Sequence, residues 1–289
     1  MFFKDIIGQD DVKRRLIESV KNGHIAHAQL FEGNDGAGAL PLALAYARYI
    51  QCTHRGEDDA CGECPSCRQM TALMHPDVHF VFPIANKKQK KEPVCDDYIA
   101  EWRNYVGETP YPSAESWQQF LATGNSQPLI YVHEAREIIR KLSLKSFESE
   151  YKIMIIWQAH LMNDACSNAI LKLLEEPFDR TLFLLVSDRP ENILETIRSR
   201  TQRIKVPPLT TDAIATALQG QPTRQGFLQE LSGKGIAAIL WQNDSGVIYG
   251  VTYIDHNSKT VFKGSLLGKE YSASVINRKY GTIPPEKTE

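Results

Sequence analysis

Four cysteines follow one another closely near the start of the chain: Cys52, Cys61, Cys64 and Cys67. Eight residues separate the first two, and two residues separate each later pair. Four thiolates at such spacings can close a tetrahedral Zn²⁺ site, and four sulfur ligands leave no coordination position for a substrate. Free surface thiols are the alternative interpretation. We predict a structural zinc site here and place the other two cysteines, Cys95 and Cys166, outside it.

A glycine-rich loop joins an apolar segment to an Ala/Leu-rich segment upstream of the cysteines. Gly33 and Gly38 have the spacing of the phosphate-binding sequence GxxxxGK[ST], and Gly36 lies between them. In that sequence backbone amides hold phosphate, the lysine neutralises it and the hydroxyl holds Mg²⁺. Here the lysine and hydroxyl positions are Ala39 and Leu40. The glycines that shape the loop are present, but the lysine charge and the hydroxyl are absent. A plain strand-to-helix turn is the alternative interpretation, because it would use the same glycines.

A second part of the same chemistry is missing from the apolar segment that ends at Trp157. In phosphate-cleaving proteins with this order of elements, the corresponding strand ends in two acidic residues that hold the metal and polarise water. Here those positions are Trp157 and Gln158, which are neutral. Phosphoryl transfer depends on charge stabilisation and positioning, so the loss of all these groups predicts no intrinsic ATP hydrolysis.

The pair Ser199-Arg200 is the last chemical candidate, and it follows the short segment Thr196-Ile197-Arg198. An exposed arginine can simply interact with the carbonyl end of a helix. The pair alone therefore indicates no function, and its significance depends on the other motifs in the chain.

Short apolar segments alternate with amphipathic ones around these residues. The predicted helices are 10–22, 41–50, 134–142, 164–175 and a helical turn at 191–197. The predicted strands are 26–31, 78–82, 153–157, 182–187 and 203–206. Buried strands that alternate with helices indicate an α/β fold whose parallel sheet is covered on both faces. Residues 83–129 interrupt the alternation and are interpreted as an insertion with one or two short helices.

Composition limits the classes of protein that remain. The chain has 289 residues, of which 42% are hydrophobic and 24% charged, with a net charge of −2. We expect one large and one smaller folded domain and no bulk attraction to nucleic acid or membranes. Neither a membrane-spanning run nor a secretory signal is visible, so we expect a cytoplasmic protein, in which clustered cysteines bind metals more often than they form disulfides.

Several motifs in order resemble the AAA+ module of bacterial DNA polymerase III clamp-loader subunits, over residues 6–208. These are Ile6-Ile7-Gly8-Gln9, Ala26-His27-Ala28-Gln29-Leu30-Phe31, the four cysteines, His75-Pro76-Asp77, residues 168–177 and Ser199-Arg200-Thr201. The last motif departs from the family's Ser-Arg-Cys at its third residue. The resemblance implies a P-loop-type parallel sheet flanked by helices, with a zinc module at 52–67.

The family resemblance also implies roles for the candidate residues. Motor subunits keep the lysine and the acidic pair, whereas this chain looks like the delta-prime subunit, which does not hydrolyse ATP. Arg200, with Ser199, would then be an arginine finger that acts in trans on ATP bound by a neighbouring subunit. Gly33, Gly36 and Gly38 would hold a nucleotide passively at most. The implied partners are the gamma/tau and delta subunits, the sliding clamp and primer–template DNA.

Two regions depart from the resemblance. The insertion contains the basic run Lys87–Lys91, which is interpreted either as a solvated loop or as a contact to DNA phosphates. After residue 208 we assign one helix, within 209–222, to a partial lid, and find no counterpart of the family's helical collar. Residues 223–289 form a β-rich tail with two or three antiparallel strands over 236–263. The tail is vaguely similar to relaxases, but His256 is its only histidine.

Two alternative functions stay open at this point. One is an active DNA-dependent ATPase that uses an atypical site. The other is a DNA-mobilisation fusion protein defined by the tail.

Overall fold

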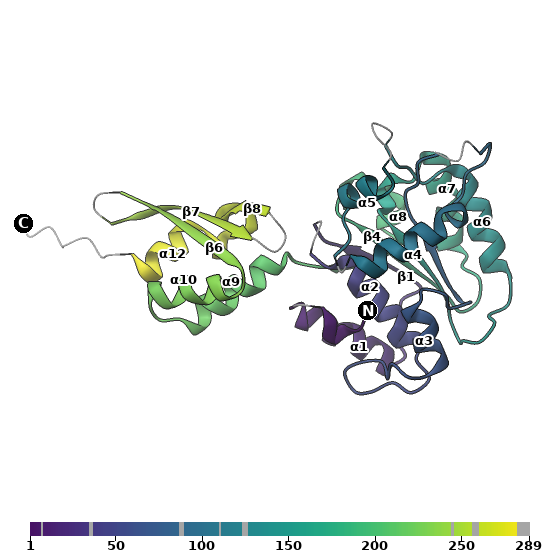
Figure 1. Cartoon of the computed structure of the whole chain (residues 1–289), viewed down its shortest axis with the longest axis horizontal. Coiled ribbons are helices and arrows are strands. Elements are labelled where there is room, and N and C mark those ends of the chain that lie inside the picture. The colour runs from purple at the N-terminus through teal and green to yellow at the C-terminus, as the bar shows by residue number, and fades with distance from the viewer. Residues whose placement is uncertain are drawn as a thin grey trace, which may run out of the picture. The chain divides into compact units, whose positions relative to one another are not determined.

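The computed structural model describes residues 1–6, 8–34, 37–86, 90–109, 111–122, 127–243, 246–255 and 260–281. The chain separates into two compact units, Met1–Pro207 and Pro208–Glu289 (Figure 1). The predicted segments 209–222 and 223–289 both fall within the second unit. Each unit has its own hydrophobic core.

The first unit is built on a parallel sheet with the strand order β2–β3–β4–β1–β5. The strands are β1 (Ala28–Glu32), β2 (Val78–Val81), β3 (Lys152–Trp157), β4 (Thr181–Ser187) and β5 (Gln202–Lys205). The inner strands β1, β3 and β4 are buried at every residue, as expected where helices cover both faces. The edge strand β5 exposes three of its four residues, which suits an unpaired edge. The predicted α/β fold is confirmed.

Helices flank this sheet. They are α1 (Asp10–Lys21), α2 (Ala39–Gln51), α3 (Pro65–Thr71), α6 (Val132–Ser143), α7 (Asp164–Glu175) and α8 (Glu195–Arg198). The helix α2 packs against β1, β3 and β4, and all of its residues are buried. It begins at Ala39 rather than at Pro41, so the predicted first helical position was wrong. Pro41 is tolerated because the first N–H that bonds within this turn is that of Leu42, to Gly38 O.

The insertion after β2 carries the short helices η2 (Cys95–Tyr98), α4 (Ile99–Glu108) and α5 (Ala114–Phe120). An aromatic cluster ties it to the sheet. The Trp102 ring stacks on Phe82 at 4.4 Å, and its centroid lies 5.5 Å from Trp117 and 5.2 Å from Trp157. The insertion is therefore a packed part of the first unit, positioned over the end of β3.

Asp77, from the His75-Pro76-Asp77 motif, holds the loop that leads into β3. Its Oδ1 accepts a hydrogen bond from the N–H of Phe147 at 2.6 Å. Its Oδ2 accepts bonds from the N–H groups of Glu148 and Ser149, at 2.8 and 2.9 Å. Three charge-assisted bonds to a carboxylate that is only 3% exposed explain why this motif has an acid at its third position.

The second unit contains a three-stranded antiparallel sheet in the order β6–β7–β8. Its elements are α9 (Leu209–Gly220), α10 (Arg224–Gly233), β6 (Ile236–Gln242), β7 (Ile248–Asp255), β8 (Thr260–Lys263), α11 (Gly264–Leu267), η5 (Lys269–Tyr271) and α12 (Ala273–Tyr280). The helices α10 and α12 pack on β6 and β7, on the same side of the sheet (Figure 1). The buried centre of this unit includes Phe227, Tyr253 and Ile276.

The described ranges hold no helix of the length and apolar character needed to cross a membrane.

Candidate functional sites

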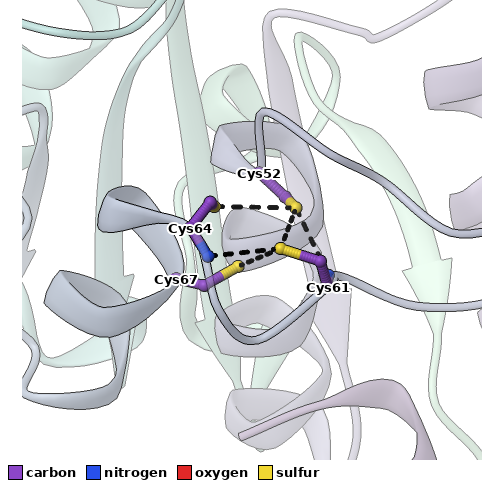
Figure 2. Close-up of side chains that lie close together, drawn as sticks. All are labelled: Cys52, Cys61, Cys64 and Cys67. Carbon is purple, nitrogen blue, oxygen red and sulfur yellow. Dashed lines mark hydrogen bonds between the residues drawn. The ribbon is translucent and has the colours of Figure 1, made fainter.

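The four clustered cysteines come from three consecutive elements (Figure 2). Cys52 directly follows α2, Cys61 lies in the loop, Cys64 caps the N-terminus of α3 and Cys67 lies in its first turn. Pro65 supplies the helical φ at the first position of α3, where no N–H is needed. The short helix thus holds Cys64 and Cys67 on the side that faces the end of α2.

The distances between the sulfur atoms suit a tetrahedral metal. Sγ of Cys52 lies 3.5 Å from that of Cys61 and 3.9 Å from that of Cys64, and the four sulfurs all lie within 4.8 Å of one another. A tetrahedron with Zn–S bonds of ~2.3 Å has edges of ~3.8 Å. The N–H groups of Cys61 and Cys64 also donate to Sγ of Cys52 and Cys61, at 3.3 and 3.4 Å.

The cluster also contains a thiol that is deprotonated at neutral pH, which favours the binding of a cation. Burial raises the pKa of the Cys64 thiol, but hydrogen bonds from Thr53 and Cys67 outweigh it and lower this pKa to about 5. Burial raises the pKa of the Cys67 thiol, and its hydrogen bonds to Cys64 and Cys52 raise it further. A bound metal would release the remaining protons. The donor set fits a metal such as zinc.

Cys95 and Cys166 lie apart from this cluster and are buried. Burial raises the pKa of the Cys166 thiol to about 12, so it behaves as a small core residue. Sγ of Cys95 donates to the carbonyl of Phe82 at 3.2 Å, and its N–H donates to the carboxylate of Glu134 at 2.7 Å. Cys95 therefore joins the insertion to the end of β2 and to α6.

The glycine loop lies between the carboxyl end of β1 and the start of α2. A Cβ at Gly33 would meet the carbonyl oxygen of Val206 at 2.9 Å, so this position excludes a side chain. The N–H of Gly33 donates to the carbonyl of Ser187 at 3.2 Å and is used within the fold. Gly38 has φ of +91°, which favours glycine. Gly36 lies outside the described residues.

A tyrosine from the insertion fills the space above this loop. Cε1 of Tyr111 would lie 3.2 Å from a Cβ at Gly38. The remaining cavity has a volume of about 20 Å³ and is lined by Gly33, Gly38, Tyr111, Trp157 and Gln158, among others. That is room for about one water molecule, whereas sites for small ligands enclose roughly 300–1,000 Å³. The structure thus brings the predicted loop and strand end together around a filled site.

The electrostatics of this site do not favour phosphate. Ala39 and Leu40, at the lysine and hydroxyl positions, are both buried. The carboxylate of Asp188, at the end of β4, lines the same cavity. Nδ1 of His160 lies 3.4 Å from Asp188 Oδ1, but burial lowers the pKa of this imidazole and favours its neutral form. Asp188 also lies 4.0 Å from Nε of the exposed Arg189, so the described lining offers a triphosphate one paired acid and no lysine.

Arg200 lies two residues after the end of α8, outside the lining of that cavity. Its Nη2 pairs with Oε1 of Glu175 at 2.7 Å, and its Nη1 donates to the carbonyl of Thr196 at 3.0 Å. The arginine side chain is 39% exposed and that of Glu175 is 43% exposed. Ser199 donates from Oγ to the Thr196 carbonyl at 3.1 Å. Arg200 is thus a half-exposed cation that is paired with Glu175 at the end of α7.

The family of DNA polymerase III delta subunits matches residues 8–210, which is more than half of the chain. The chain belongs to this family. The resemblance to bacterial clamp-loader subunits, which rested on motifs, is therefore confirmed at the level of the family. The match spans the glycine loop, all four clustered cysteines and Arg200.

Named relatives agree with this assignment. The delta' subunit of DNA polymerase III from Bacillus subtilis is 28% identical over 212 residues, which cover 73% of this chain and 51% of that protein. The delta' subunit from Yersinia pestis is 29% identical over 65% of this chain and 43% of that protein. The tau subunit from Bacillus subtilis is 26% identical over 73% of this chain and 30% of that protein. The chain thus spans about half of these relatives, or less.

A solved structure from Thermotoga maritima, of a protein related to the DNA polymerase III gamma subunit, aligns with a TM-score of 0.41 at 18% identity. The alignment covers 78% of this chain and 54% of that protein.

Sequence patterns did not indicate the roles of three residues at these sites. Tyr111 gave no signal, because nothing in the local sequence of an insertion shows which loop it will cover. Glu175 lies in the motif at 168–177, but its pairing with Arg200 depends on how α7 packs on α8. Asp188 follows a strand that was predicted correctly, and its position after a buried strand end was the available signal.

Proposed function

We propose that the chain is a delta-prime-like subunit of a bacterial AAA+ clamp loader, which does not hydrolyse ATP itself and supports the loading of the sliding clamp onto primed DNA. It would act with gamma/tau and delta subunits, as the names of its relatives suggest. In this proposal residues 1–208 are the clamp-loader domain, 209–222 a partial lid and 223–289 an additional β-rich part, and the protein works in the cytoplasm.

The observation that carries this proposal is the filled glycine loop. Tyr111 covers Gly38, the cavity is about 20 Å³, and the lysine and hydroxyl positions are buried apolar residues. An ATPase needs a cation and a metal ligand at that place, because phosphoryl transfer is catalysed almost entirely by charge and position. The degenerate loop is retained as a turn in the fold.

Although it would not hydrolyse ATP itself, this subunit would contribute Arg200 to hydrolysis by a neighbouring subunit. A guanidinium that leaves Glu175 could reach the phosphates of ATP bound to a neighbouring subunit. Arginine fingers supplied in trans raise rates by ~10³–10⁵ where the nucleotide site is otherwise complete. Ser199 would hold the turn through its bond to the Thr196 carbonyl.

The zinc module would be structural, because its four sulfurs use every position of a tetrahedral ion. Lys90 and Lys91 belong to the basic run, and Lys90 pairs with Asp97 through Nζ. Lys87 and Lys88 lie outside the described residues. Contact between this run and primer–template DNA is a further part of the proposal.

Phosphate release by the isolated full-length chain tests the proposal. We expect no turnover above buffer with ATP, Mg²⁺ and primed DNA, together with no retention of labelled ATP in equilibrium dialysis. We also expect the chain to co-purify with a motor subunit of the same clamp loader. ATP turnover by the chain alone would instead support the active ATPase interpretation.

A further inference from the structure

The antiparallel sheet of the second unit has helices on one face only, within the ranges that the structure describes (Figure 1). The helices α10 and α12 cover the buried side chains of Val251 and Tyr253. The pairing of the strands assigns six side chains to the opposite face, which we call the open face: Ile239, Trp241, Tyr249, Thr252, Ile254 and Lys263. Its larger apolar side chains Ile239, Trp241 and Tyr249 are exposed, and such side chains mark interaction sites where they lie together.

A β-bulge brings Tyr249 to the open face. The pairing of β6 with β7 shifts by one residue after Trp241, so Tyr249 is the extra residue of the bulge. Ile248 and Val251 are both buried in the core of this unit. The two residues between them, Tyr249 and Gly250, therefore both belong to the opposite face, as is usual where a bulge redirects side chains. The Tyr249 side chain is 67% exposed.

The indole of Trp241 is held across the neighbouring strand. A Cβ at Gly250 would lie 3.1 Å from Cδ1 and 3.4 Å from Cγ of Trp241, so the ring occupies the space above this glycine. Nε1 of the indole donates to Oγ1 of Thr252 at 3.4 Å. With both contacts made, Trp241 is still 52% exposed. One side of the indole therefore packs on the sheet, and its exposed side is available to a second planar group.

The charge on the open face is positive. Lys263 of β8 pairs with Thr252, so both residues belong to the same face, and Lys263 is exposed. The described residues of this face include no acid, and Asp255 of β7 is buried on the side of the helices. A phosphate diester on the open face would thus meet a cation and no described carboxylate.

Exposed aromatic rings beside a cation fit single-stranded nucleic acid. Proteins that bind single strands stack the bases on aromatic side chains and attract the backbone with positive charge. A sheet with helices behind it and aromatic side chains in front is one fold that does so. Sites that select RNA read its 2′-hydroxyl, whereas the hydroxyl of Thr252 is already engaged by the indole. A second copy of the chain would bring another Lys263 to a face without a described acid.

We propose that the open face binds single-stranded DNA, with bases stacked on Trp241 and Tyr249 and a backbone phosphate paired with Lys263. This inference goes beyond the proposed function, because it gives the second unit a role that needs neither ATP nor another subunit. The two are tested separately: clamp loading by phosphate release and co-purification, and this site by binding of DNA to the isolated chain.

Fluorescence anisotropy with the zinc-loaded full chain tests the proposal. The probe is a labelled oligothymidylate of about 12 nucleotides, within the range of site sizes of single-strand-binding folds. We expect saturable binding with a Kd at or below ~100 μM at ~50 mM salt. A duplex of the same length should bind at least ~5-fold more weakly, since its paired bases stack on one another and offer no free face. Oligouridylate should bind no more tightly than the DNA probe.

Three positions separate stacking from charge. Trp241→Leu and Tyr249→Ser should each weaken binding at least ~5-fold, as expected for the loss of one stacked base, and Trp241→Phe should stay within ~3-fold of the wild-type chain. Lys263→Gln should lower the slope of log affinity against log salt by about 0.7, the value for one phosphate contact with a single strand. Because these side chains are exposed, the unfolding temperature should hardly change.

Two matched controls remove the same groups elsewhere. Lys269→Gln removes an exposed lysine from η5, which packs with α9, α11 and α12, and Phe147→Ser removes an exposed ring from the first unit. Both should leave the affinity within ~2-fold, as expected for distant sites.

The proposal is overturned if the DNA probe does not bind, if the duplex binds as tightly, if oligouridylate binds more tightly, or if Trp241→Leu keeps the wild-type affinity. A dimer in sedimentation that Trp241→Leu abolishes, without binding of the probe, would assign the open face to a second copy and would also overturn it.

Discussion

The cysteine cluster shows how far single side chains determine chemistry in this protein. Four sulfurs within 4.8 Å of one another, at the end of one helix and the start of the next, fit one tetrahedral ion. Because the cluster joins α2 to α3, the metal would fix the position of both elements. Its loss should therefore affect folding as well as metal content.

We expect about one zinc per chain in metal analysis of the purified protein. The double variant Cys61→Ser plus Cys64→Ser should hold less than ~10% of that zinc and unfold at a lower temperature. Cys166→Ser is the control: it changes a buried cysteine outside the cluster, so its zinc content should stay unchanged. Full zinc content in the double variant would show that the cluster is not a metal site.

Glu134 is a buried carboxylate that makes stability depend on pH. Burial raises its pKa, although its Oε2 accepts the N–H of Cys95 at 2.7 Å. The charged form is thus penalised in the folded state, so the protein loses stability as pH rises through the raised pKa and Glu134 ionises. Glu134→Gln can keep the bond to Cys95 and carries no charge.

We expect Glu134→Gln to raise the free energy of unfolding by about 1 kcal/mol at pH 7–8. The gain should shrink as pH falls below the raised pKa, where the wild-type carboxyl is protonated. Thermal unfolding at a series of pH values measures this difference. A gain that grows on acidification would contradict the assigned burial of a charged Glu134.

At the scale of elements, the loop before β3 depends on a single acid. Asp77 accepts three backbone N–H bonds from residues 147–149, and the adjacent Phe147 side chain is 79% exposed. The bonds and not apolar burial hold this loop. The element should therefore loosen when the carboxylate is replaced, even if the sheet stays folded.

Asp77→Asn should lower the free energy of unfolding by roughly 1.5–3 kcal/mol, because an amide has one acceptor oxygen in place of two. Limited proteolysis with chymotrypsin should then cut after Phe147 faster than in the wild-type chain. Asp179→Asn, which changes an acid in the loop between α7 and β4, should leave this cut unchanged. Equal cleavage rates in all three chains would show that Asp77 does not hold the loop.

Sequence patterns predicted the helices and strands whose own apolar residues show that they are buried. The segments 153–157, 164–175 and 182–187 were predicted within one residue because continuous apolar runs mark the strands and Pro177 follows the helix. The helices α10 and α12 were not predicted, since their apolar residues are few and become buried only against β6 and β7. The cysteine site could be predicted from spacing, whereas the closure of the glycine loop by Tyr111 required tertiary structure.

For the whole molecule, two separate hydrophobic cores imply that the first unit can fold by itself. A chain shortened to residues 1–208 should keep its zinc and unfold within ~5 °C of the full chain's first transition, since few contacts are expected to be lost at such a boundary. Circular dichroism and metal analysis measure both. Failure of this shorter chain to fold would show that the second unit supports the first.

In the proposed function this chain supplies Arg200 to ATP that a neighbouring subunit binds. This role is tested most directly by phosphate release from a motor subunit mixed with the wild-type chain, with Arg200→Ala, or with Arg189→Ala, whose side chain is also exposed. We predict that the wild-type chain and Arg189→Ala stimulate hydrolysis, and that Arg200→Ala still binds the motor subunit but loses most of this stimulation. Equal stimulation by Arg200→Ala would contradict the account.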